Sequence, residues 1–237
     1  MRLAVWSGPR NISTAMMYSF ANRSDFEAVD EPFYASYLKF TGLNHPMRDE
    51  ILASQSINPT EVIETLTGEQ NIGSLSQYQK HMTQHMTPKI PRKWMLDVNN
   101  VFLLRHPARV VSSFAKKYSN LTVNDIGVSQ QVALFKYLRA AGQNPLVLNS
   151  EDLRQDPETK LRQLCCGLGI EFQPSMLGWP KGGMPCDGVW ARHWYGAVHS
   201  SSGFGDKEGA LPKLSRHLSD VVNKVLLDYN FMMKFSL

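Results

Sequence analysis

The chain contains few cysteines and little charge for its 237 residues. There are three cysteines, Cys165, Cys166 and Cys186, and no Cys-x-x-Cys pair. The odd number argues against a disulfide framework, and the missing pair excludes a zinc ribbon. Only 19% of the residues are charged, and the formal net charge is +4. This balance is too mild to indicate a nucleic-acid surface, although it suits an anionic ligand.

Long hydrophobic runs are missing as well. No stretch of about 18 apolar residues occurs, so the sequence predicts no membrane-spanning helix. The first apolar run, at 3–6, is too short for the core of a signal peptide. Together with the sparse cysteines, this leads us to expect a cytoplasmic protein. With 43% apolar residues and a mass of 26.8 kDa, residues 1–237 are expected to form a single domain.

Short apolar runs alternate with segments of helical spacing at both ends of the chain. The expected strands cover residues 3–6, 26–29, 101–104 and 145–148. The expected helices cover residues 13–22, 107–118, 129–141, 157–167 and 211–229. This alternation predicts an α/β fold, a three-layer sandwich with a central parallel sheet. Residues 35–95 are expected to form a helical insertion over one edge of the sheet, within which 76–86 fits a strand or a helix.

The loop after the first expected strand has the features of an anion site. It reads SGPRNIST over residues 7–14 and precedes a helix, whose N-terminal N–H groups can hold phosphate. Arg10 adds charge, and Ser13 and Thr14 add hydroxyl donors. A Walker A loop would need Gly, Lys and Ser or Thr where Ser13, Thr14 and Ala15 stand. Magnesium-dependent NTP hydrolysis is therefore disfavoured, but phosphate binding is not; an ordinary strand-to-helix turn fits the segment equally well.

A second candidate anion site lies at residues 101–114, VFLLRHPARVVSSF. Arg105 follows an expected buried strand, a helix starts two residues later, and Ser113 follows Arg105 by eight residues. Because open α/β sheets bind ligands at the carboxyl ends of their strands, both side chains could reach one phosphate. A salt bridge for Arg105 and an ordinary helix hydroxyl for Ser113 explain the pattern equally well.

Taken together, the two segments resemble the nucleotide-binding motifs of sulfotransferases that use 3′-phosphoadenosine 5′-phosphosulfate (PAPS). The first motif reads KSGTT in cytosolic members, and RNIST at residues 10–14 matches it with Arg in place of Lys and Ile in place of Gly. The second motif has an Arg at a strand end and a Ser eight residues later, as Arg105 and Ser113 do. A third segment, LNSEDLRQDPE at 148–158, is similar to the family's strand–YEDL..DP–helix block. The strongest likeness is to short bacterial sulfotransferase-like proteins with SGPRN.STA and EPFY segments.

The resemblance implies a P-loop NTPase-like fold and PAPS as the cofactor, without a metal. The product formed from PAPS would be adenosine 3′,5′-bisphosphate (PAP). It implies sulfuryl transfer to a hydroxyl or amine of a small-molecule acceptor. The implied cofactor-binding residues of the two motifs are Arg10, Asn11, Ile12, Ser13, Thr14, Arg105 and Ser113. Arg10 would also stabilise the leaving phosphate. A late Gly-containing loop, with Ser202, Gly203 and Phe204, would close over the nucleotide, although a loop packed by its own aromatic residues fits this segment too.

Sulfuryl transfer needs a base for the acceptor's proton, and three residues are candidates. Glu31 follows the second expected strand, in the early position where several sulfotransferase branches have a Glu base. His81 and His85 lie between the nucleotide motifs, where cytosolic members have a His shortly after a Lys; here Lys80 precedes His81. Glu31 could instead be a carboxylate at a helix start, next to the proline that follows it, and His81 and His85 could be ordinary surface or core histidines. A zinc site is not expected, because Met82 breaks the HExxH pattern and no third ligand is evident.

Two other functions fit the same residues. One is a P-loop-type kinase or another nucleotide-dependent transferase, and the other is a non-catalytic nucleotide-binding relative. We expect the segment 35–95 and the loops at 173–210 to enclose a small-molecule acceptor. Neither a nucleic acid nor a membrane is expected as a partner, and the sequence carries no signal for an oligomeric state.

Overall fold

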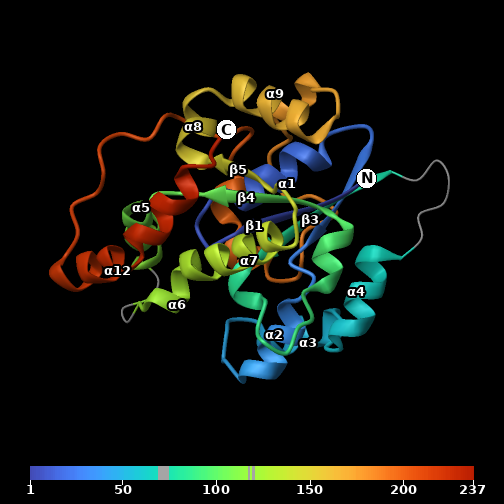
Figure 1. Cartoon of the computed structure of the whole chain (residues 1–237), viewed down its shortest axis with the longest axis horizontal. Coiled ribbons are helices and arrows are strands. Elements are labelled where there is room, and N and C mark those ends of the chain that lie inside the picture. The colour runs from blue at the N-terminus through green and yellow to red at the C-terminus, as the bar shows by residue number, and fades with distance from the viewer. Residues whose placement is uncertain (69–74, 117, 119–120) are drawn as a thin grey trace.

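A five-stranded parallel sheet forms the centre of the computed structural model, which describes residues 1–68, 75–116, 118 and 121–237 (Figure 1). The strands are β1 (Arg2–Ser7), β2 (Phe26–Asp30), β3 (Ser76–Met82), β4 (Asn99–Leu104) and β5 (Leu146–Asn149). Their order in the sheet is β2-β3-β1-β4-β5, and every neighbouring pair is parallel. The predicted α/β fold with a central parallel sheet is confirmed.

Helices connect the strands and cover both faces of the sheet. The α-helices are α1 (Ser13–Ala21), α2 (Tyr34–Thr41), α3 (Arg48–Ser54), α4 (Pro59–Thr67), α5 (Pro107–Phe114), α6 (Val123–Ile126), α7 (Val128–Ala140), α8 (Ser150–Gln155), α9 (Pro157–Leu168), α10 (Ala191–Trp194), α11 (Gly196–His199) and α12 (Arg216–Met233). Short 3₁₀ helices are η1 (Thr83–His85), η2 (Lys93–Asp97) and η3 (Pro174–Leu177). In the described part of the chain, none of these helices combines the length and the apolar character that crossing a membrane requires.

Strand β1 shows why the sheet needs helices on both sides. Leu3 and Val5 belong to one apolar cluster with residues of α1 and α9, whereas Ala4 and Trp6 belong to a second cluster with residues of α7 and α12. All four side chains are at most 1% exposed. A strand buried on both faces is usually apolar along its length, as this run is. Figure 1 shows the resulting layers, with α9 above the sheet and α7 below it.

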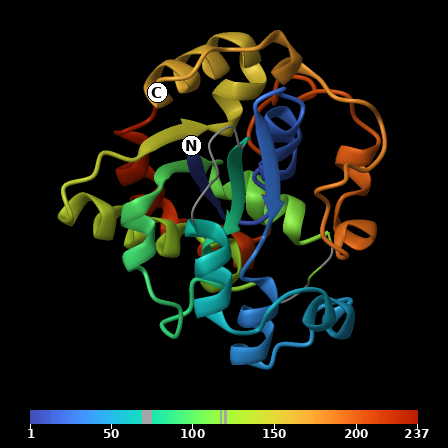
Figure 2. The same ribbon diagram turned by 90° about the vertical axis from the view of Figure 1, so that its right-hand side faces the viewer.

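The expected helical insertion over residues 35–95 is wrong in part. Helices α2, α3 and α4 do lie together beside the sheet (Figure 2), but β3 follows them and lies between β2 and β1. The sequence of β3, SQYQKHM, lacks the apolar pattern of a buried strand. It is buried nevertheless, because Gln79 and Lys80 find polar partners inside the protein.

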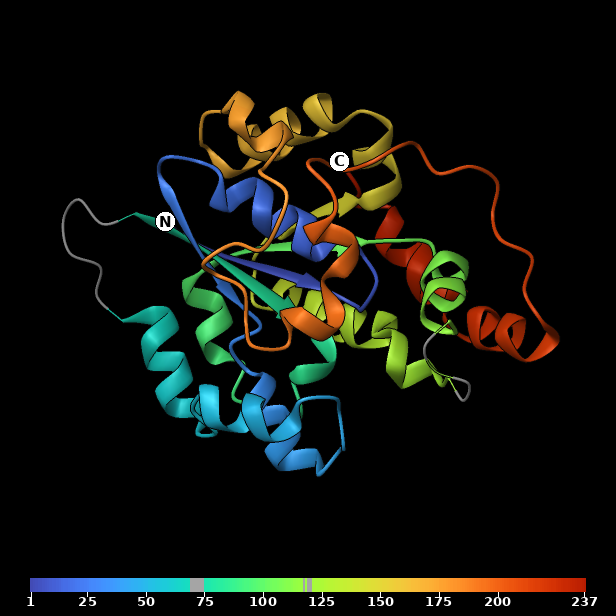
Figure 3. The same cartoon turned by 180° about the vertical axis from the view of Figure 1, so that it is seen from behind.

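All five strands point the same way, so their carboxyl ends share one edge of the sheet. The loops that follow β1, β2, β3 and β4 meet there, as expected for a ligand site in this class of fold. In Figure 3 the orange segment with α10 and α11 crosses close to the ends of β1 and β3. The contact between Tyr195 and Lys80 of β3 confirms that this late segment reaches the same edge.

Candidate active site

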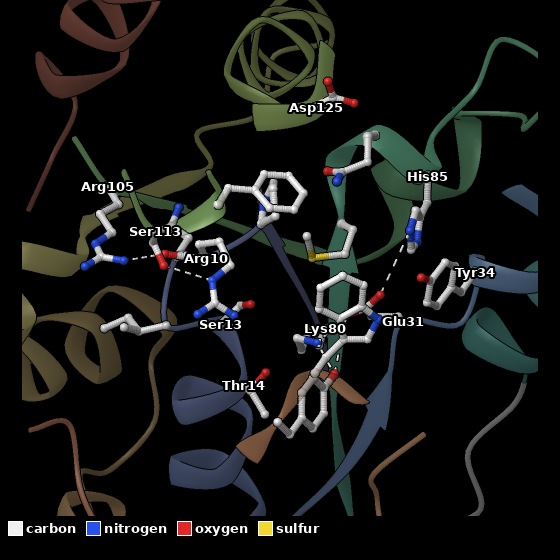
Figure 4. A pocket seen from close by; sticks show the side chains of 18 of the residues that line it. Arg10, Ser13, Thr14, Glu31, Tyr34, Lys80, His85, Arg105, Ser113 and Asp125 are labelled. Carbon is white, nitrogen blue, oxygen red and sulfur yellow. Dashed lines mark hydrogen bonds and ion pairs between the residues drawn. The ribbon is translucent and has the colours of Figure 1, made fainter. Parts of the chain in front are cut away.

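A cavity of about 1300 Å³ opens at the carboxyl edge of the sheet. Its lining comes from the loops after β1 and β2, from β3 and the turn after it, from α5 and from the late segment around α10 and α11. Figure 4 shows that Arg10, Arg105 and Ser113 lie at one end and Glu31, Lys80 and His85 at the other. We call these the arginine end and the Glu31 end.

The loop after β1 has an unusual backbone. Arg10 (φ 60°) and Ile12 (φ 48°) both adopt the left-handed conformation that costs a side-chain-bearing residue about 1–2 kcal/mol. Alternation of right- and left-handed residues turns successive backbone N–H groups toward one concave side, which suits an anion. Ile12 is the N-cap residue of α1, so Ser13 is the first helical residue. The motif that this loop resembles has Gly at this position, and Ile12 adopts the left-handed backbone conformation that glycine favours.

The arginine end brings the residues of the two predicted anion segments into contact. Arg10 Nε donates a hydrogen bond to Ser113 Oγ at 3.0 Å, and an Arg105 guanidinium nitrogen donates to the Arg10 carbonyl oxygen at 2.6 Å. Burial, and then the neighbouring Arg105 charge, lowers the pKa of Arg10. Asn11 is buried and donates from Nδ2 to the Leu103 carbonyl, which joins this loop to β4.

An internal carboxylate lies among the guanidinium groups at this end. Glu208 pairs with Arg105, with Arg154 at 2.9 Å and with Arg109 at 3.2 Å, and its side chain is only 8% exposed. Arg105 and Arg154 also line the cavity. Three arginines around one carboxylate have the donors and the charge that a phosphate requires, so Glu208 occupies a position suited to an anionic ligand.

The Glu31 end is organised by a buried ammonium group. Lys80 Nζ contacts Asp30 Oδ1 at 2.9 Å, Glu31 Oε1 at 2.5 Å and the Tyr195 hydroxyl at 2.5 Å. Burial by itself works against the charged lysine, but the two carboxylates outweigh it and raise the pKa of Lys80. Lys80 therefore stays charged and holds one oxygen of Glu31 in place.

Glu31 itself is held in a strained conformation. Its φ is 39°, in the left-handed region, and its side chain is 10% exposed. Backbone strain of this kind persists where the surroundings impose it, often at functional sites. While Oε1 is bound to Lys80, Oε2 lies 4.0 Å from His85 Nε2 (Figure 4). The second oxygen is thus the one available to a ligand in the cavity.

His85 lines the cavity between two tyrosines. Its ring stacks on Tyr34 at a centroid distance of 4.5 Å and on Tyr37 at 4.6 Å. Burial, followed by the nearby His45 and Lys80, lowers the pKa of His85 well below its usual range. The imidazole is therefore neutral at neutral pH. It lies beside Glu31, but Lys80 is the cation that pairs with the Glu31 carboxylate.

His81 is not brought to the cavity. It lies on β3 with its ring stacked on Trp6 at 4.3 Å, inside the apolar layer, and burial lowers its pKa to about 3. Successive strand residues face opposite sides of the sheet, so Lys80 reaches the cavity while His81 points into the core. This placement argues against the predicted role of His81 as a base.

The late loop contributes in part as predicted. Gly203 and Phe204 line the cavity, and Phe204 is buried against Trp179 at a ring distance of 5.3 Å. Ser202 is exposed and lies outside the cavity lining. Its carbonyl oxygen accepts a hydrogen bond from the backbone N–H of Trp179. The predicted contact of Ser202 with a nucleotide therefore has no support from its position.

Comparison with known proteins adds to this geometry. A family model described as a sulfotransferase domain matches residues 1–235. The chain belongs to the sulfotransferase domain family. The solved sulfotransferase domain from the curacin biosynthetic pathway has a TM-score of 0.54 at 16% identity, covering 95% of this chain and 97% of that one. At that identity the likeness is one of fold, and it confirms the predicted sulfotransferase (P-loop-like) architecture.

Two curated relatives come from Arabidopsis thaliana. Branched-chain-amino-acid aminotransferase-like protein 1 is 41% identical over 202 residues, which are 84% of this chain and 36% of that protein. Branched-chain-amino-acid aminotransferase-like protein 2 is 33% identical over 230 residues, 96% of this chain and 40% of that protein. The chain thus spans about two fifths of the length of these relatives.

Sequence reasoning missed several residues of this sulfotransferase domain's cavity. Arg154 lies in the segment 148–158 and Tyr195 just before the late loop, but neither was named as a site residue. Glu208 lies outside these segments, and no local pattern marks it. A signal did exist for Asp30, which directly precedes Glu31 at the end of a strand. That signal becomes informative only when Lys80 is known to pair with Asp30 across the sheet. The pairing cannot be predicted without the order of the strands.

The residues at the arginine end fit the 3′- and 5′-phosphate groups of PAPS. Arg10, Arg105 and Arg154 line the cavity there, and the Glu208 carboxylate pairs with Arg105 and Arg154 in the way that a phosphate could. The loop beside them contains the left-handed residues Arg10 and Ile12, a backbone geometry found in anion-binding loops. These features give both the charge and the backbone donors that an anionic nucleotide needs.

Proposed function

We propose that the protein transfers a sulfuryl group from PAPS to a hydroxyl or amine of a small-molecule acceptor. The observation that carries this proposal is that one cavity joins the arginine end to the carboxylate of Glu31. Membership of the sulfotransferase domain family supports it. The arrangement places charge for an anionic nucleotide at one end and a proton acceptor at the other.

At the arginine end, each side chain has a role that its contacts support. When bound, PAPS supplies the sulfuryl group, whose bond to the phosphate breaks as a bond to the acceptor oxygen or nitrogen forms, leaving PAP. Arg10 stabilises the negative charge that develops on the 5′-phosphate, with the N–H groups of Ser13 and Thr14 at the start of α1. Arg105 and Ser113 hold the 3′-phosphate. The Glu208 carboxylate moves away from Arg105 when this phosphate binds.

At the other end, Glu31 Oε2 accepts the proton of the acceptor's hydroxyl or amine. Lys80 fixes Glu31 through Oε1, and the Tyr195 hydroxyl, which donates to Asp30, completes the support. His85 is the second candidate for the base because its Nε2 lies 4.0 Å from the same carboxylate. Burial lowers the pKa of His85, so its imidazole is a weaker proton acceptor than an ordinary histidine.

The proposed location is the cytoplasm. Cys165, Cys166 and Cys186 are all free thiols, as is usual for proteins kept in a reducing compartment. The proposed partner is a small molecule, because side chains from several segments line one cavity.

Calorimetric titration of the protein with PAP tests the nucleotide site, with ATP and magnesium as the comparison. We expect PAP to bind without added metal and more tightly than ATP, since two phosphate positions are provided by arginine and backbone groups. Incubation with PAPS and a panel of acceptors, followed by detection of PAP, then tests turnover. Tighter binding of magnesium–ATP than of PAP would contradict the proposal and favour a kinase.

A further inference from the structure

The walls of the Glu31 end are aromatic. Tyr34, His85 and Tyr37 form a continuous stack of rings on one side. Tyr118 and Trp194 stack on each other at a centroid distance of 6.1 Å, and both line the same cavity. Tyr34 and His85 are buried, whereas Tyr37, Tyr118 and Trp194 are partly exposed, so ring surface remains accessible from the cavity.

Two carboxylates face the same space. Figure 4 shows Asp125 of α6 above the cavity and Glu31 below it. Burial, and then the negative charge of Asp125, raises the pKa of Tyr37 and of Tyr118. Asp125 therefore acts electrostatically on the aromatic wall. Glu31 contributes in the same way to the raised pKa of Tyr34, again after burial. Both charges thus act across the aromatic region.

Most of the positive charge in the cavity lies away from these walls, and the lysine near them is paired. Among the described residues that line the cavity, the lysines and arginines are Arg10, Arg105, Arg154 and Lys80. The three arginines are at the other end, and Lys80 is already bound by Asp30 and Glu31. Burial lowers the pKa of His45 and of His85, so neither histidine adds a cation at neutral pH.

Aromatic ring faces next to carboxylates attract cations and disfavour anions. A cation over a tyrosine or tryptophan face gains about 0.5–2 kcal/mol, more as water is excluded. We propose that the acceptor is a small alcohol carrying an ammonium group, with the cation held between the aromatic rings and the two carboxylates. This inference rests on the proposed function, because the hydroxyl of this alcohol is taken to lie at Glu31. It narrows the class of acceptor to alcohols with an ammonium group.

A matched pair of alcohols tests the proposal. Choline and 3,3-dimethylbutan-1-ol have the same shape and differ in the charge of one central atom. Binding of each to the full chain is followed by NMR titration of the ligand signals, with and without PAP. We expect choline to bind about tenfold more tightly than its neutral counterpart. Equal binding, tighter binding of the neutral alcohol or of a phenol, or no binding of either alcohol would overturn the proposal.

Variants of Tyr37 show whether the aromatic wall is responsible. Tyr37→Leu is expected to reduce the preference for choline several-fold, whereas Tyr37→Phe keeps the ring face and is expected to retain it. Tyr37 suits this test better than Asp125, which caps α6 by accepting two hydrogen bonds from Thr122. Retention of the full preference in Tyr37→Leu would count against a cation site on this wall.

The same titrations separate this inference from the proposed function. If PAP does not bind while choline is still preferred over its neutral counterpart, the assignment to PAPS-dependent transfer fails and the cation site stands. If PAP binds while the two alcohols do not differ, the function stands and the ammonium acceptor is wrong.

Discussion

At the arginine end of the cavity, the motif side chains come from two strand–loop–helix units, whereas the Glu31 end combines four segments that are far apart in the sequence. Arg10 belongs to the unit β1–α1, and Arg105 and Ser113 belong to β4–α5. Glu31 follows β2, Lys80 is on β3, His85 ends η1 and Tyr195 follows α10. The first kind of site depends on local structure, and the second depends on how strands are ordered. The two ends should therefore respond differently to substitution.

The largest effect is expected at the Glu31 end. Glu31→Gln removes the proposed proton acceptor but keeps the shape of the side chain, so turnover with PAPS should fall by roughly 10²–10⁴-fold. PAP affinity, measured by calorimetry, should be unchanged because the arginine end is intact. Glu27→Gln, an exposed position on the same strand, is the matched control. Near-normal turnover in Glu31→Gln would move the base to His85, for which His85→Asn is the corresponding variant.

The opposite response is expected for Arg105→Ala. It removes a partly buried guanidinium from the arginine end, and PAP binding should weaken by about 2–4 kcal/mol. Choline binding without nucleotide should stay the same, which would separate the two ends experimentally. Arg162→Ala, which breaks an exposed ion pair on α9, provides the control for a lost surface charge. A folded Arg105→Ala protein with normal PAP affinity would contradict the assignment.

A smaller change of opposite sign is expected for Glu208→Gln. The variant removes the carboxylate that competes for Arg105 and Arg154, so PAP should bind more tightly by ~1 kcal/mol, roughly fivefold. Asp206→Asn changes the net charge equally at a nearby exposed position and should have little effect. If Glu208→Gln instead weakens PAP binding, Glu208 positions the arginines rather than competing for them.

The last effect is on stability and not on binding, and it concerns the histidine that faces away from the cavity. The pKa of His81 is about 3 in the folded protein, below the usual 6.5, so the unfolded chain binds more protons between these values. The free energy of unfolding therefore falls as the pH drops below 6.5, with a His81 contribution of up to about 1.4 kcal/mol per pH unit. Urea unfolding of His81→Gln between pH 7 and 5 should show a shallower decline. An unchanged slope would mean that His81 is accessible to protons in the folded state.

Sequence reasoning located the arginine end better than the Glu31 end for a physical reason. A strand, a short loop and a helix N-terminus form a compact unit, so the position of Arg10 relative to α1 follows from nearby residues. The eight-residue spacing of Arg105 and Ser113 likewise spans one such unit. By contrast, the periodicity of residues 76–86 is ambiguous, because β3 carries buried polar side chains whose partners lie on other segments. The choice between His81 and His85 depended on this strand.

From the sequence alone, the alternating α/β architecture could be determined, and the loop after β1, Glu31, Arg105 and Ser113 could be named as candidates for a site. These features arise from local hydrophobic patterns and from short sequence motifs. Only the tertiary structure decided that β3 lies inside the sheet, that Lys80 faces the cavity while His81 faces the core, and that Glu208 lies among three arginines. Strand order and long-range ion pairs bring together residues that no local pattern connects, and burial then sets which charges persist.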